Sequence, residues 1–227
     1  MEQNLKIGYS SINYVYDVIN KYSFNSILVV SANKSYLSDN QSIIFFKKKI
    51  KDFKYIRYYG FNSNLNIKDI KKGISIYKKN NCDMIIAIGG GSVIDMAKCI
   101  NAFRLSDLSE LVSRIKNNKI FLEGVPLLAI PTTTGTGSES TQFSVVYINK
   151  KKYSVSSNCL LPSDVIIDPI LSLTQSSNQL ACSGMDAFCQ AIESYWAVSS
   201  NKISKQYALE AIRLCKNNII EAVKNKD

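Results

Sequence analysis

Histidine is absent from all 227 residues of the sequence. Without imidazole these residues cannot form a Ser-His-Asp triad, a Cys-His dyad or a metal site that histidine completes. Enzymes that depend on those groups are therefore excluded within this chain. Six cysteines are present, but no two of them have C-x-x-C spacing. We expect reduced thiols rather than disulfides or a zinc knot.

Long hydrophobic runs are also missing. No apolar run reaches the roughly 18–20 residues that a membrane-spanning helix needs. The N-terminus, MEQNLKIGYSS, lacks the apolar core of a secretory signal peptide. A composition of 46% apolar and 20% charged residues is typical of a globular protein with a sizeable core. We therefore predict a cytoplasmic protein without a membrane partner.

Acidic residues are few, and the net charge is +10. Many lysines fall in short runs, such as Lys47–Lys49 and Lys150–Lys152. A nucleic-acid binder would gather such charges on one face with aromatic residues between them. Here the runs coincide with expected helix ends and a hairpin turn, which predicts a solvated surface and no nucleic-acid partner. The positive field would favour an anionic substrate.

The first 130 residues alternate strand and helix signals. Short apolar runs rich in strand-forming residues lie at residues 27–31, 55–59, 84–88 and 125–130. Their continuous apolar character indicates strands buried on both faces. Between them, apolar residues recur at helical spacing, as at Ile67, Ile70 and Ile74. This alternation predicts an α/β fold with a Rossmann-like, doubly wound parallel sheet.

The pattern changes after Pro131. Residues 144–149 and 153–157 flank Lys150–Lys152 and predict a β-hairpin with its turn at the lysines. We place a domain boundary near Asp168-Pro169, which gives a dinucleotide-binding α/β domain over residues 1–172.

Residues 179–198 and 203–223 both carry helical apolar patterns. They predict the beginning of an all-helical domain over residues 173–227. Two helices cannot bury their apolar faces alone, so we expect the chain to be the N-terminal part of a longer protein.

The segment IAIGGGSVIDMAK joins an apolar strand to a helix through Gly89–Ser92. Glycine lets the backbone approach an anion and take a positive φ, and a helix N-terminus offers unpaired N–H groups. Ser92 can cap the helix or donate its hydroxyl to phosphate. The segment predicts a pyrophosphate site, although it lacks the third glycine of G-x-G-x-x-G and the lysine of a P-loop. A plain tight turn, followed by an Asp95–Lys98 ion pair, is the alternative.

A second loop, PTTTGTGSE over residues 131–139, also follows an apolar strand. It places hydroxyl groups and flexible backbone at the carboxyl end of the sheet, where open α/β sheets bind ligands. The alternative is a Ser/Thr-rich loop with a helix cap at Ser138. Two such loops at neighbouring strand ends favour a ligand site.

The predicted helix that contains GMDAFCQAIE places Asp186, Gln190 and Glu193 on one face. A carboxylate and an amide one turn apart can hold a metal, a water or a substrate. Polar groups that only face solvent are the alternative.

Three segments together resemble the iron-containing (group III) alcohol dehydrogenase family. They are GGGSVIDMAK, PTTTGTGSEST and LLPSDVIIDPILSLT with GMDAFCQAIESY, in the family's order and approximate spacing. The resemblance implies an NAD(P)-dependent oxidoreductase that acts on an alcohol or aldehyde and forms a homodimer at full length. It also implies a divalent metal between an α/β cofactor domain and an all-helical domain.

The family's cofactor contacts carry over to ten positions of this sequence. The pyrophosphate contacts match Gly90, Gly91 and Ser92, with Asp95 behind them, and the other contacts match Thr132, Thr133, Thr141, Phe143, Lys152 and Leu171. The family's first metal ligand matches Asp186, which forms the candidate catalytic pair with Gln190.

Two departures from the family pattern affect the cofactors. The second metal ligand of the family is a histidine where this sequence has Gln190, a neutral and poor ligand for Fe²⁺ or Zn²⁺. Metal binding therefore stays open, and without a metal we expect the Gln190 amide to donate to the carbonyl oxygen of the substrate. Many NAD-preferring members carry an aspartate where Ala32-Asn33 stand here. Its absence allows NADP as well as NAD.

The run SGMDAFCQAIESYW is similar to the phosphonoacetaldehyde reductase subgroup, whose substrate is a small anionic aldehyde. A polyol dehydrogenase of the glycerol dehydrogenase type is an alternative, but it usually has Lys-Thr where this sequence has Ser92-Val93. The lyase dehydroquinate synthase shares the general fold but has a different glycine motif. A catalytically inert nucleotide-binding fragment is the non-enzymatic alternative.

Overall fold

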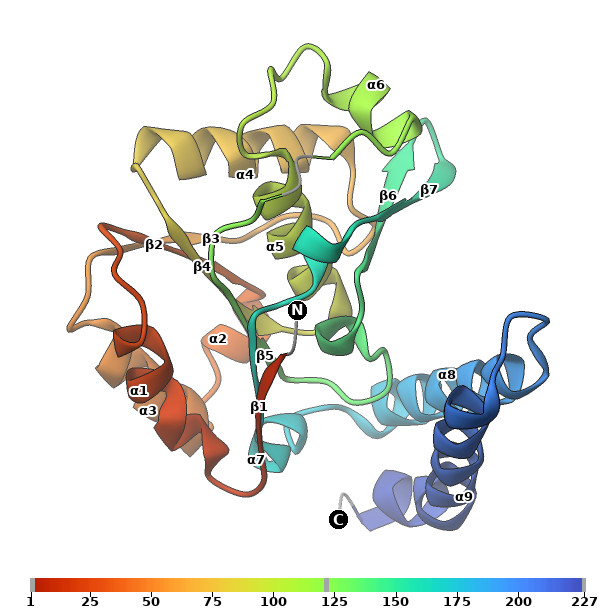
Figure 1. Cartoon of the computed structure of the whole chain (residues 1–227). Helices are drawn as coiled ribbons and strands as arrows, with labels where there is room; N and C mark the ends of the chain where they lie inside the picture. The colour runs from red at the N-terminus through yellow and green to blue at the C-terminus, as the bar shows by residue number, and fades with distance from the viewer. Residues whose placement is uncertain (1–2, 121–122, 226–227) are drawn as a thin grey trace. The chain divides into compact units, whose positions relative to one another are not determined.

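The computed structural model describes residues 3–120 and 123–225. Its main sheet consists of parallel strands in the order β1-β8-β5-β4-β2-β3. The strands are β1 Asn4–Ile7, β2 Ile27–Ser31, β3 Tyr55–Tyr58, β4 Met84–Gly89, β5 Leu127–Pro131 and β8 Asp164–Ile167. Helices pack on both faces of this sheet (Figure 1), which confirms the predicted Rossmann-like, doubly wound α/β fold.

The central strands are the ones that the apolar runs predict. Every residue of β2 and β4 is buried, because both faces of these strands are covered by helices. The expectation of burial on both faces is wrong for β3, which is an edge strand with three half-buried residues. Edge strands tolerate polar side chains, and Arg57 occupies such a position.

Two helical layers enclose the sheet. One face is covered by α1 Val15–Asn20 and α3 Gln41–Ile50, which bury residues such as Ile19 and Phe46. The other face is covered by α4 Ile67–Lys79, α5 Gly91–Phe103 and α6 Leu111–Lys116, with Ile74 and Ile100 in the core. The shorter helices of this unit are η1 Ser11–Tyr14, α2 Asn33–Tyr36, η2 Ser138–Ser140, η3 Asn158–Leu160 and α7 Pro169–Ser172.

The chain leaves the neighbouring strands β2 and β4 in opposite directions. It passes from β2 to α3 on one face of the sheet and from β4 directly into α5 on the other. Such a divergence opens a crevice at the carboxyl ends of the strands, where doubly wound sheets bind their ligands. The glycine turn after β4 therefore lies where the fold favours a ligand site.

The predicted hairpin is formed by β6 Phe143–Ile148 and β7 Lys151–Ser156. Its turn begins one residue earlier and ends two residues earlier than predicted, because Lys151 and Lys152 belong to β7. Asn149 and Lys150 take φ values of 50° and 65°. Two successive positive φ values are the geometry of a type I′ turn, which matches the twist of a hairpin.

The chain divides into two compact units, one of Met1–Thr132 with Ser138–Leu171 and one of Thr133–Gly137 with Ser172–Asp227. The second unit contains α8 Ser177–Trp196 and α9 Lys202–Asn225, which pack against each other. A Cβ atom at Gly184 would lie 3.2 Å from the Ile219 side chain, so this glycine permits the close approach of the two helices. None of the helices in the described ranges is long and apolar enough to cross a membrane.

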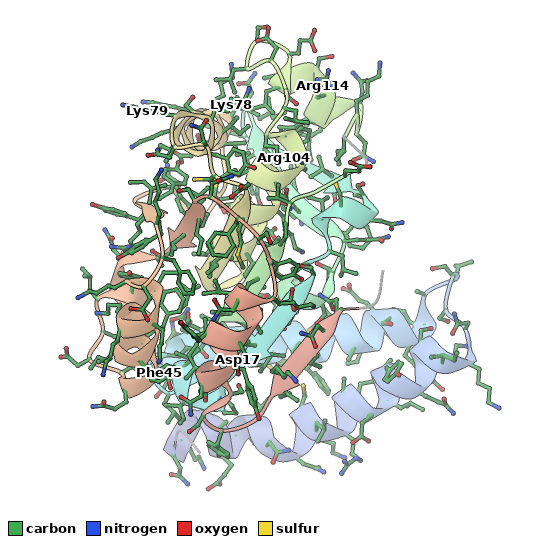
Figure 2. All side chains as sticks on the ribbon, turned by 60° about the vertical axis from the view of Figure 1, so that its left-hand side comes forward. Asp17, Phe45, Lys78, Lys79, Arg104 and Arg114 are labelled. Atoms are coloured by element: carbon green, nitrogen blue, oxygen red, sulfur yellow. The ribbon has the colours of Figure 1, made fainter. Side chains whose placement is uncertain are left out.

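Lysine runs lie at helix ends, as predicted. Lys47–Lys49 form the last turn of α3, and Lys78 and Lys79 form the last turn of α4. Figure 2 shows Lys78 and Lys79 on α4. The Lys78 Nζ donates to the carbonyl oxygen of Ser106 at 2.9 Å. Cations at these positions offset the negative ends of the helix dipoles.

Candidate cofactor-binding site

The glycine turn places free backbone N–H groups at the carboxyl end of the sheet. Gly90 is the N-cap of α5, and its carbonyl accepts from the N–H groups of Val93 and Ile94 at 2.9 and 3.2 Å. The N–H groups of Gly91 and Ser92 precede this ladder and have no acceptor within the helix. Gly90, Gly91 and Ser92 are half-buried, so an anion can reach them. The positive end of the α5 dipole favours that anion.

Two details of this turn differ from expectation. Positive φ values among the described glycines occur at Gly8, Gly60, Gly135 and Gly137, so the turn after β4 does not use them. Gly89 is instead required for close packing, because a Cβ atom there would lie 2.6 Å from a Val93 methyl group. Ser92 is not the cap but the second residue of α5, and the cap makes no side-chain hydrogen bond. The Ser92 hydroxyl therefore does not cap α5.

Asp95 and Lys98 do not form the ion pair that the alternative interpretation offered. No salt bridge joins them among the described residues. Asp95 Oδ2 accepts from the N–H of Val145 at 3.0 Å. Lys98 Nζ donates to Thr141 O at 2.6 Å, and to Thr141 Oγ1 and Phe143 O at 2.9 Å. Through these hydrogen bonds, both side chains hold residues 141–145 at the start of the hairpin against α5.

Burial of these two groups disfavours their charged forms. Burial raises the pKa of the Asp95 carboxyl, although the Val145 N–H and the Lys98 charge oppose the shift. Burial lowers the pKa of Lys98 to about 8, against the opposing effect of Asp95. The Lys98 side chain is fully buried. Its three acceptors are neutral oxygens, so Lys98 positions backbone rather than neutralising a carboxylate.

The loop after β5 begins beside the glycine turn, because β4 and β5 are neighbours with Gly89 opposite Pro131. The N–H of Thr132 donates to Gly89 O at 3.0 Å, and the Thr132 residue is buried. Thr133 falls in the second compact unit. The two loops therefore start side by side, as the sequence predicts.

The other predicted cofactor contacts have varied surroundings. Thr141 is half-buried under Lys98, whereas Phe143 and Lys152 are exposed on the hairpin. Leu171 is 1% exposed and packs in the core on the α1 and α3 face of the sheet. Their roles as cofactor contacts stay predictions.

Sequence reasoning missed Gln175. Its Oε1 accepts from the N–H of Thr134 at 3.1 Å, and the residue is 4% exposed. A buried glutamine that bonds loop backbone fixes the loop conformation. Its position in a polar stretch before a helix gave no signal, since TQSSNQ is typical of a solvated linker.

Gly135 has no room for a side chain. Its φ is 105°, and a Cβ atom would lie 2.0 Å from the carbonyl oxygen of Ser183. Gly137 in the same loop has a φ of 62° and open space around it. Both glycines have a positive φ, but only Gly135 lacks space for a Cβ atom. Substitutions at the two positions therefore distinguish backbone strain from a steric clash.

We expect Gly135→Ala to lower the free energy of unfolding of the second unit by more than about 3 kcal/mol, because a backbone clash adds to the strain of positive φ. Gly137→Ala is the matched control and should cost about 1–2 kcal/mol, from strain alone. Urea denaturation followed by circular dichroism measures both. Equal losses in the two variants would show that the Ser183 contact is unimportant.

The acidic face of α8 is exposed. Gln190 Nε2 donates to Asp186 Oδ2 at 2.8 Å, and Glu193 also faces solvent. Within the described ranges, no group of three or more Cys, Asp or Glu side chains could hold a metal ion. Asp186 and Gln190 offer one carboxylate and one neutral amide, fewer good ligands than a divalent cation needs. These residues alone do not fit a divalent cation.

Gln190→His is expected to raise the affinity of this helix face for a divalent cation. A histidine one turn after Asp186 supplies a second good ligand on the same face, so the affinity for Co²⁺ at pH 7.5 should rise at least roughly tenfold. Ser194→His, about 12 Å along the helix from Asp186, is the control and should leave the affinity near that of the unsubstituted protein. Titration by Co²⁺ absorbance distinguishes them. Equal affinity in the two variants would count against Asp186 as a potential ligand.

The chain diverges after β2 and β4, and an anion-accepting helix N-terminus follows β4. Together these features define a Rossmann-like α/β protein. Two family models match the sequence. The one described as iron-containing alcohol dehydrogenase covers residues 3–169, and the C-terminal model of the Fe-containing alcohol dehydrogenase family covers residues 180–227. The chain belongs to the iron-containing alcohol dehydrogenase family.

Several characterised proteins are similar to the chain. It is 33% identical over 163 residues to the NAD-dependent methanol dehydrogenase of Bacillus methanolicus, a match that covers 69% of this chain and 41% of that protein. The structure of an alcohol dehydrogenase from Oenococcus oeni superposes with a TM-score of 0.90 at 28% identity, over 100% of this chain and 60% of that one. The structure of Bifidobacterium kashiwanohense sulfoacetaldehyde reductase in complex with NAD⁺ superposes with a TM-score of 0.89 at 26% identity, and the match covers 98% of this chain and 59% of that one. The chain thus spans about half the length of these relatives.

Proposed function

We propose that the protein containing this chain reduces a small anionic aldehyde with a nicotinamide dinucleotide. The observation that carries the proposal is the pair of free N–H groups at Gly91 and Ser92, at the switch point of a parallel sheet. This geometry suits the pyrophosphate of a dinucleotide. Membership of a family with NAD-dependent relatives gives independent support.

Residues of the chain act by binding and orienting. When bound, the cofactor supplies the hydride. Gly91 and Ser92 hold the pyrophosphate, while Asp95 and Lys98 fix the hairpin segment that carries Thr141 and Phe143. These roles make the site rigid before the cofactor arrives, which lowers the entropic cost of binding.

Gln190 is the proposed donor to the carbonyl oxygen of the aldehyde. One of its amide N–H groups is held by Asp186 at 2.8 Å, which fixes the amide and leaves the second N–H to donate. A donor aimed at an oxygen that gains negative charge stabilises the transition state. Asp186 stays a proposed metal ligand only together with donors outside the described residues.

An anionic substrate is favoured by two observations. The net charge of +10 attracts anions. A similar solved structure is that of a sulfoacetaldehyde reductase, whose named substrate is an aldehyde with an anionic group. Phosphonoacetaldehyde has the same arrangement with a phosphonate, so we propose it as the substrate. The division at residues 172 and 173, the homodimer and the cytoplasmic location also stay proposals.

The test uses the complete protein with NADH or NADPH and a panel of aldehydes, with and without a chelator. We expect loss of nicotinamide absorbance to be fastest with phosphonoacetaldehyde and slower with uncharged aldehydes of equal length. A preference for glycerol or another polyol would favour the polyol dehydrogenase alternative. Dinucleotide binding without any turnover would favour an inert binding protein.

A further inference from the structure

Arg57 reaches from the edge strand β3 to the end of the neighbouring strand β2. Its Nε donates to Ser31 Oγ at 2.6 Å, and its Nη2 donates to Asn33 Oδ1 at 2.9 Å. The rings of Tyr36 and Tyr59 flank the guanidinium, whose central carbon lies 3.9 and 4.2 Å from their centroids. Hydrogen bonds and two aromatic rings therefore hold this cation in place.

The charge of Arg57 has no anionic partner within the described residues. Its acceptors are a hydroxyl and two neutral carbonyl oxygens, and no salt bridge includes it. Burial lowers the pKa of the Arg57 guanidinium, because the group has lost water without gaining a carboxylate. Lys47 adds a second positive charge, 5.6 Å from the centre of the Tyr36 ring. Nη1 makes no hydrogen bond in the described structure, so it can donate to a ligand.

The position of this cation relates it to the proposed cofactor site. Ser31 is paired with Ile88, the residue before Gly89, so the end of β2 adjoins the glycine turn. In doubly wound sheets this strand end lies beside the adenosine ribose. A carboxylate there accepts from the ribose 2′-hydroxyl of NADH, whereas an arginine accommodates the 2′-phosphate of NADPH. This chain has a neutral Asn33 and a fixed guanidinium.

We propose that Arg57, with Asn33, binds the 2′-phosphate of NADPH and makes the protein prefer NADPH to NADH. The inference rests on the dinucleotide site proposed above. The fork of N–H groups in a guanidinium matches phosphate oxygens and forms charge-assisted hydrogen bonds with them. Because Ser31, Asn33 and the two tyrosine rings already hold the side chain, little rotamer freedom remains to be lost on binding.

The test is equilibrium binding of NADPH and of NADH to the whole protein, followed by nicotinamide fluorescence. The wild type should bind NADPH at least roughly tenfold more tightly than NADH. Arg57→Gln should weaken NADPH binding by roughly ten- to hundredfold and change NADH binding by less than about threefold. Lys54→Gln removes the same charge before the amino end of β3 and is the matched control. It should change neither affinity by more than about threefold.

Asn33→Asp is a second variant that leaves Arg57 in place. The new carboxylate pairs with the guanidinium and repels a 2′-phosphate, so the preference should turn toward NADH. A wild type that binds NADH as tightly as NADPH would overturn this inference alone. An Arg57→Gln variant that weakens the binding of NADPH and NADH equally would also overturn this inference alone. Failure to bind either dinucleotide would overturn the proposed function together with it.

Discussion

Replacing Ser92 by aspartate is expected to weaken dinucleotide binding severely while the fold is kept. The carboxylate would lie in the first turn of α5, where the N–H groups of Gly91 and residue 92 are proposed to donate to the pyrophosphate. Two like charges at 4 Å repel by about 4 kcal/mol at an effective dielectric constant near 20, which is a loss of at least roughly a hundredfold in affinity. The affinity is measured by fluorescence titration with NADH and NADPH.

The fold of this variant is protected by the same helix dipole. An acidic residue in a first turn stabilises a helix by about 0.3–1 kcal/mol, so Tm should stay equal or rise slightly. Ser92→Asn has a similar size without the charge and should cost less than about tenfold in affinity. If the aspartate and asparagine variants bind equally well, no phosphate lies at this helix terminus.

Lys98→Met is expected to destabilise the first unit, with a pH dependence that identifies the cause. The substitution keeps the apolar stem but leaves the oxygens of Thr141 and Phe143 without their donor. Unpaired buried acceptors cost about 1–3 kcal/mol each, and relief from burying a charge offsets part of this. We expect a net loss of about 2 kcal/mol at pH 7.

The sign of the pH dependence follows from the lowered pKa of Lys98. The folded protein releases this proton near pH 8, whereas the unfolded chain keeps it up to its usual pKa of 10.5. Between these values the unfolded state binds more protons, so the wild type gains stability with rising pH relative to Lys98→Met. The gain should approach about 3 kcal/mol by pH 10.5.

Urea denaturation of both proteins between pH 7 and pH 10.5 measures this difference, in which the titration of tyrosines and cysteines cancels. Lys68→Met on the exposed surface of α4 is the control. It should change the unfolding free energy by less than about 0.5 kcal/mol at every pH. A constant difference between wild type and Lys98→Met would contradict the burial of a charged amine.

Local sequence patterns predict the centre of this fold well. The runs at β2 and β4 are continuous and apolar, and strands with both faces covered need that pattern. The edge strand β1 and its neighbour β8 were not predicted. Each has four residues, and Asn4 pairs with Asp164, 160 positions away in the sequence. Pairing over such a separation leaves no periodic signal in either segment.

In the candidate site, too, features that depend on consecutive residues could be predicted, and features that depend on distant contacts could not. The glycine turn could be located because its function depends on consecutive residues, from Gly89 to Ser92. The anchoring by Lys98 could not, since its acceptors lie 43 and 45 residues away. Arg57 was hidden for a similar reason, because its partners come from a neighbouring strand and helix. A charged residue in a half-buried edge strand carries no sign of such partners.

The most direct test of the account is amide NMR of the isotopically labelled protein during titration with NADPH. The largest shifts are expected at the amides of Gly91 and Ser92, because pyrophosphate accepts from these N–H groups. Shifts at Asn33 should accompany them. Shifts confined to α8 and α9, or a spectrum unchanged at saturating nucleotide, would contradict the assignment of the glycine turn as the phosphate site.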